Sequence, residues 1–130
     1  SNTILEQDVL VGHSNGCALI YQAVKEGGIP PKLVFFVAPA LDSDIDLDPK
    51  LFPNVVILHT EHDWALKLAK YLPFTIWGSM GVGGARKQLS NVKNIDCTNW
   101  ALGHSDYFSK ANLAKTTALL RSEITHAFTK

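Results

Sequence analysis

Three mainly apolar stretches without polar alternation mark the chain, at residues 9–11, 32–38 and 54–59. Such stretches are typical of parallel strands that are covered on both faces of a sheet. A fourth stretch, at residues 92–100, is more polar and predicts a strand towards the edge of the same sheet. The pattern therefore predicts four strands, three of them of the buried type.

Helical periodicity follows the first, third and fourth of these strands, whereas an acidic loop joins the second strand to the third. The stripe of the first helix consists of Cys17, Ile20, Tyr21 and Val24, and that of a second, ended by Pro73, consists of Ala65, Leu68, Ala69 and Leu72. The last helix carries a stripe of Leu113, Leu120, Ile124 and Phe128. The order of elements predicts an α/β fold, with a mainly parallel four-stranded sheet flanked by helices in a single domain over residues 1–130.

A tight turn joins the first strand to the first helix, and it reads Gly12-His13-Ser14-Asn15-Gly16. A strand, a sharp turn and a helix in succession are what a nucleophile elbow requires. Gly12 and Gly16 are expected to omit side chains that would crowd the turn, which leaves Ser14 exposed at its tip. At the start of a helix, backbone N–H groups can stabilise a developing oxyanion. The alternative interpretation is a glycine-rich turn with a surface serine.

Two further polar residues follow strand ends, Asp63 after residues 54–59 and His104 after residues 92–100. Because the carboxyl ends of parallel strands meet at one edge of a sheet, Ser14, Asp63 and His104 are expected on the same edge. A serine needs a base to become a nucleophile, and a histidine can take and return its proton near neutral pH. A carboxylate on the other ring nitrogen orients that base.

These motifs, in this order, resemble the C-terminal half of an α/β-hydrolase, from its fifth to its eighth strand, over essentially the whole chain. Residues 12–16 match the family's Gly-His-Ser-x-Gly form. Residues 59–63 resemble the acid-bearing stretch after the seventh strand, although Thr60 replaces the usual glycine. Gly103-His104, followed by Phe108, resembles the histidine loop after the eighth strand.

The resemblance implies a serine hydrolase that cleaves a small carboxylic ester, thioester or amide through an acyl-serine, without a cofactor. Ser14 would be the nucleophile, His104 the base and Asp63 the orienting acid. The resemblance also implies three residues for the oxyanion hole and for substrate binding: the backbone N–H of Asn15, His13 and Trp64. Trp64, with Trp77 and Trp100, can line an apolar pocket or belong to the core.

The family has four strands before the elbow strand, and this sequence lacks them. Residues 9–11 would then form a bare apolar edge, which natural proteins avoid. We therefore expect a fragment of a longer hydrolase, or an edge that a second copy or a missing N-terminal segment covers. The family's second oxyanion donor also lies in the missing part, and losing such a donor costs about 10²–10³ in rate.

The composition narrows the function classes. The sequence has twelve basic and twelve acidic residues and no net charge. It therefore lacks the excess of positive charge that is typical of nucleic-acid-binding proteins. No apolar stretch approaches the ~18 residues of a membrane span, and no signal peptide is recognised. Two cysteines, Cys17 and Cys97, fit a reducing compartment better than a disulfide scaffold, which predicts a cytoplasmic location.

Several alternatives remain at this stage. The alternative source of the orienting acid is Asp42 or Asp44, in an acidic loop whose simplest interpretation is a solvated one. A metal site would draw on His13, His59, His62, Asp63 and His104, although their spacing matches no standard zinc motif. Residues 81–87 lack the spacing of a phosphate loop and are expected to form a flexible loop. A non-catalytic hydrolase-like binding module and a flavodoxin-like binding domain are the alternative classes.

Overall fold

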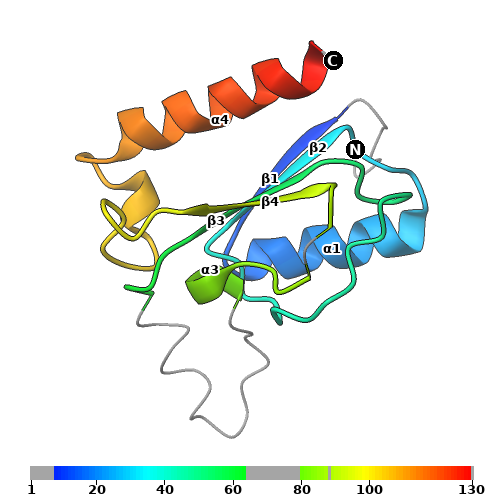
Figure 1. Ribbon diagram of the computed structural model, residues 1–130, viewed down its shortest axis with the longest axis horizontal. Coiled ribbons are helices and arrows are strands. Elements are labelled where there is room, and N and C mark those ends of the chain that lie inside the picture. Colours follow the sequence, from blue (N-terminus) through cyan, green and yellow to red (C-terminus); the bar gives the residue numbers. More distant parts are fainter. Residues whose placement is uncertain (1–7, 64–79, 88, 130) are drawn as a thin grey trace, which may run out of the picture.

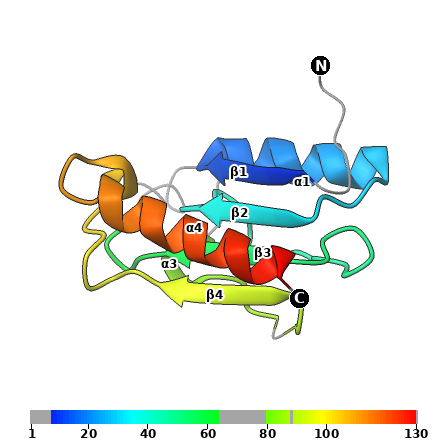
Figure 2. The ribbon, with the colours of Figure 1, turned by 90° about the horizontal axis from the view of Figure 1, so that it is seen from above.

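The computed structural model describes residues 8–63, 80–87 and 89–129, and it has a four-stranded sheet in which all neighbouring strands are parallel. The elements are β1 (Val9–His13), α1 (Asn15–Gly27), β2 (Leu33–Val37), β3 (Val55–His59), α3 (Met80–Gly83), β4 (Val92–Asp96), the 3-10 turn η1 (Asp106–Phe108) and α4 (Leu113–Phe128). The strands lie in chain order across the sheet (Figure 2). The predicted α/β class and parallel sheet are confirmed, and the helix expected over residues 65–72 lies outside the described residues.

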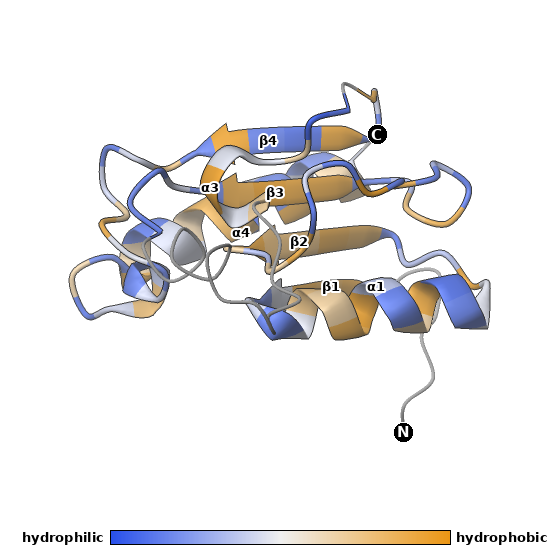
Figure 3. Ribbon diagram, turned by 90° about the horizontal axis from the view of Figure 1, so that it is seen from below, coloured by the Kyte–Doolittle hydropathy of each residue, from blue (hydrophilic) through white to orange (hydrophobic). Residues whose placement is uncertain are grey.

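Helices cover both faces of the sheet, with α1 and α3 on one side and α4 on the other (Figure 1). Successive residues of a strand point to opposite faces, so β2 contributes to both layers. Val34 and Phe36 pack with Cys17 and Val24 of α1, whereas Phe35 packs in the second cluster under α4. All five residues of β2 are buried, which is why this strand is apolar throughout (Figure 3).

The two edge strands differ in polarity. β4 carries polar residues and is only partly buried, as the sequence predicts for an edge. β1 pairs with β2 on one side and with no other strand of the described residues. Val11, in the middle of β1, is 48% exposed. The described part of the chain therefore leaves an apolar edge uncovered at the strand that leads into Ser14.

The apolar stripe predicted for α4 packs against the core only in its middle, where Leu120 and Ile124 are partly buried. Leu113 and Phe128, at the two ends of that stripe, are 50% and 46% exposed. The buried residues of the helix are Thr116, Glu123 and Ala127. The buried polar residues, which the predicted stripe does not include, are satisfied: Thr116 donates to a backbone carbonyl, and Glu123 forms an ion pair with Lys93 at 2.8 Å.

Residues 81–83 belong to α3, so the loop expected over residues 81–87 begins only at Gly84. Gly84 ends that helix in a left-handed conformation with φ of 76°. The Asn94 side chain then binds both backbone groups of Ala85, accepting its N–H and donating to its carbonyl, each at 2.9 Å. Arg86, the next residue, forms an ion pair with Asp44 at 3.0 Å. Its positive charge partly neutralises the acidic loop that carries Asp44.

None of the helices in the described part of the chain combines the length and the apolar composition needed to cross a membrane.

Candidate active site

The turn between β1 and α1 holds Ser14 in an unusual backbone conformation. Its φ is 57° and its ψ is −122°, a region that non-glycine residues adopt only when their surroundings impose it. The surroundings here are hydrogen bonds, since the Ser14 N–H donates to the Val37 carbonyl at 3.1 Å and its own carbonyl accepts the N–H of Ala40 at 3.2 Å. The turn therefore fastens Ser14 to the carboxyl end of the neighbouring strand β2.

Gly12 allows the strand and the helix to approach each other at this turn. A Cβ at Gly12 would lie 2.9 Å from Ile20 Cδ1 and 3.1 Å from Cys17 Cα. The crowding predicted at Gly12 is thus present. The same prediction is wrong at Gly16, because a Cβ there would meet no described atom within 4 Å. Only the first glycine of the motif is required by the packing of the described residues.

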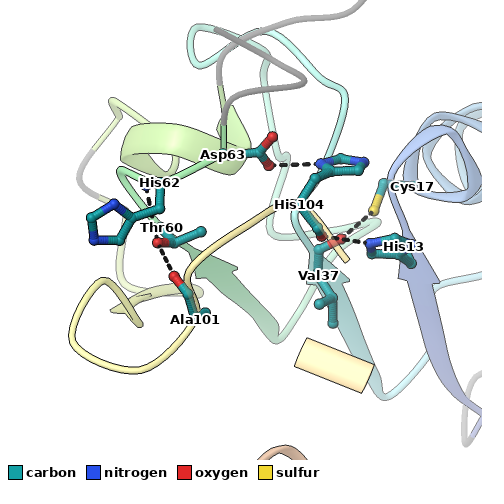
Figure 4. A network of polar contacts seen from close by, with 8 residues as sticks. All are labelled: His13, Cys17, Val37, Thr60, His62, Asp63, Ala101 and His104. Carbon is teal, nitrogen blue, oxygen red and sulfur yellow. Dashed lines mark hydrogen bonds and ion pairs between the residues drawn. The ribbon is translucent and has the colours of Figure 1, made fainter. Parts of the chain in front are cut away.

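Asp63 and His104 form a direct contact at the same edge of the sheet (Figure 4). The distance between His104 Nδ1 and Asp63 Oδ2 is 2.7 Å, and the side chains are 13% and 0% exposed. An ionised carboxylate can only accept, so Nδ1 carries the ring proton and Nε2 carries the lone pair. This is the tautomer of a histidine that acts as a base through Nε2.

His13 connects the end of β1 to the loop that carries His104. Its Nε2–H donates to the backbone carbonyl of His104 at 2.9 Å. Its ring also lies 5.0 Å from the ring of His104 and meets Phe108 edge-on at 5.2 Å. Because Ser14 follows His13 directly, these contacts bring the elbow and the histidine loop to the same corner of the sheet.

Asn15 is exposed and is the first residue of α1. The first N–H groups of a helix have no partner within that helix, so the Asn15 N–H is not used by the hydrogen bonds of α1. The predicted binding residue Trp64 lies outside the described residues, as does Trp77. Trp100 packs edge-on against the buried Tyr107 at 5.7 Å, in the core cluster under α4.

Thr60 is a site-forming residue that the sequence marks only as a departure from the family's glycine. It follows β3 and is fully buried, and its hydroxyl donates to the carbonyl of Ala101 at 2.6 Å. The position of Thr60, a polar residue directly after an apolar strand, is the sequence feature that could have indicated its place at this edge of the sheet. Its partner, Ala101, could not be identified without the fold.

The alternative acids lie elsewhere. Asp44 is exposed and paired with Arg86, and Asp42 is exposed in the same loop. Asp106 holds its own loop together, because its carboxylate accepts the N–H of Leu102 and the side-chain amide of Asn112, both at 2.9 Å. The carboxylate that contacts the His104 ring is that of Asp63.

The histidines do not converge on a metal site. The Nδ1–H of His59 donates to the Val82 carbonyl at 3.1 Å, and the His62 ring points away from Asp63 (Figure 4). Among residues 8–63, 80–87 and 89–129, no three His, Cys, Asp or Glu side chains come together closely enough to hold a metal ion.

Both cysteines are free and buried. Burial raises the pKa of Cys17 to about 12 and that of Cys97 to about 11. Since the thiolate is the reactive form, neither thiol is activated as a nucleophile at neutral pH. Cys17 lies directly below the elbow, with its Sγ 3.9 Å from the Val37 carbonyl, and it fills core volume there.

Comparisons with protein-family models, with curated proteins and with solved structures found no match for this chain.

Proposed function

We propose that this chain is a serine hydrolase of the α/β-hydrolase type, which cleaves a small carboxylic ester, thioester or amide. The observation that carries the proposal is the 2.7 Å contact between His104 Nδ1 and the fully buried Asp63, beside an elbow that holds Ser14 at positive φ. An oriented base and a strained serine at one strand edge are the parts that acyl transfer needs.

In the proposed reaction, Ser14 Oγ attacks the acyl carbon while His104 Nε2 takes the hydroxyl proton. The Asn15 N–H donates to the resulting oxyanion. The intermediate then collapses, the bond to the leaving group breaks, and His104 returns the proton to that group. Water, activated by the same base, attacks the acyl-serine, which releases the carboxylic acid and restores Ser14. Asp63 stabilises the imidazolium in both halves of the cycle.

The remaining features fit this proposal. The chemistry uses side chains and backbone of this chain and requires no cofactor. Two free buried thiols suit a reducing, cytoplasmic setting, which we propose on that basis.

Hydrolysis of a short-chain acyl ester by the wild type and by Ser14→Ala tests the proposal. Ser14→Ala should abolish turnover, because no other hydroxyl occupies the elbow. Ser90→Ala is the matched control, since Ser90 is exposed and lies before β4, at the opposite end of the sheet. Turnover that is the same in Ser14→Ala as in the wild type would contradict the proposal.

A further inference from the structure

One buried hydroxyl joins the two loops that carry Asp63 and His104. The Oγ1–H of Thr60 donates to the Ala101 carbonyl at 2.6 Å, and Oγ1 also accepts the N–H of His62 at 3.2 Å. The Thr60 hydroxyl therefore donates to the loop that carries His104 and accepts a hydrogen bond from the loop that carries Asp63. Figure 4 shows both bonds beneath the contact between Asp63 and His104.

These bonds close a short ring of the chain. Thr60 stands three residues before Asp63, and Ala101 stands three residues before His104. The two segments are joined at one end by the hydroxyl–carbonyl bond and at the other by the 2.7 Å contact between His104 Nδ1 and Asp63 Oδ2. The carbonyl of Thr60 also accepts the Asp63 N–H at 3.3 Å. Because both segments are so short, a displacement at Thr60 is passed on to the carboxylate and the ring.

We propose that Thr60 is a positioning residue, which sets Asp63 against His104 through the bond from its hydroxyl to Ala101. The inference rests on the proposed function, in which the contact between Asp63 and His104 orients the base. Thr60 does not itself touch the reacting atoms. The family's usual glycine has no donor for this bond, so the arrangement belongs to the threonine of this chain.

Valine has the shape of threonine without the hydroxyl. Thr60→Val therefore removes one partner each from the Ala101 carbonyl and the His62 N–H, and the two loops are expected to separate. A misplacement of about 1 Å can cost about 10²-fold in rate, so we expect kcat to fall about 10- to 100-fold. KM should change little, since Thr60 is fully buried and offers no surface to a substrate. Thr60→Ser keeps the hydroxyl and should retain the wild-type kcat.

A second buried threonine supplies the matched control. The hydroxyl of Thr116 also donates to a backbone carbonyl at 2.6 Å, that of Tyr107. Thr116→Val thus loses the same kind of bond, with the same length and burial, on α4. It controls for general loosening of the protein, because it is not part of the ring that contains Asp63.

The deciding measurement is the low-field NMR resonance of the His104 Nδ1–H, recorded without substrate and assigned through its loss in Asp63→Asn. We expect the resonance to disappear or move upfield in Thr60→Val and to persist in Thr60→Ser and Thr116→Val. The inference is overturned if the resonance is unchanged in Thr60→Val, if Thr116→Val removes it equally, or if the wild type lacks it. A wild type with the resonance but without hydrolysis overturns the proposed function alone.

Discussion

Gly12 gives the most direct test of how the elbow is packed. In Gly12→Ala the new methyl group would lie 2.9 Å from Ile20 Cδ1 and 3.1 Å from both Cys17 Cα and Cys17 N. The end of the isoleucine side chain can rotate away, but the Cys17 backbone cannot move without displacing the first turn of α1. We expect this overpacking to lower the free energy of unfolding by about 1–3 kcal/mol.

Gly16→Ala is the matched comparison in the same motif. No described atom lies within 4 Å of the added methyl group, and Gly16 is helical, so alanine should be neutral or stabilise the protein by up to about 1 kcal/mol. Urea unfolding followed by circular dichroism measures both effects: the Gly12→Ala midpoint should fall, and the Gly16→Ala midpoint should stay or rise, at a common slope. A Gly12→Ala protein as stable as the wild type would refute the packing argument.

Asp63→Asn should lower ester turnover by about 10⁴-fold with the circular dichroism spectrum unchanged, because the amide favours the wrong tautomer of His104. Asp44→Asn should leave turnover unchanged, and the reverse result would move the acid to the acidic loop. The buried thiols of Cys17 and Cys97, with pKa raised by burial to about 12 and about 11, should resist iodoacetamide at pH 8 until urea unfolds the protein. In the unfolded chain both thiols have the ordinary cysteine pKa of 9.0, so they ionise there at lower pH than in the folded protein. The urea midpoint should therefore fall as the pH rises above 9.0, and less steeply in Cys17→Ala.

The sheet and the edge that carries the candidate site were predictable because they follow from local patterns. Buried parallel strands are continuously apolar, so β2 and β3 are visible in the sequence within one residue of their ends. Once the strands are parallel, polar residues after their carboxyl ends must share an edge. That argument places Asp63 and His104 together without any knowledge of their side-chain contact.

The features that the sequence did not predict depend on partners that are distant in the chain. Thr116 and Glu123 can be buried because their polar groups have partners, the Tyr107 carbonyl and the Lys93 ammonium group. The amphipathic pattern of a helix does not reveal such pairs. The backbone of Ala85, in the 81–87 segment, is hydrogen-bonded by Asn94, a residue of another element. The bond from Thr60 to Ala101 spans 41 residues, so only the folded chain brings its two ends together.

We propose that Ser14 is an activated nucleophile, and covalent labelling of its hydroxyl is the experiment that decides this. The wild type and Ser14→Ala would each be treated with a fluorophosphonate, and the intact masses compared with the 14.2 kDa of the unlabelled chain. We expect one adduct on the wild type and none on Ser14→Ala. A wild type that takes up no label, or a Ser14→Ala variant that is labelled to the same extent, would contradict it.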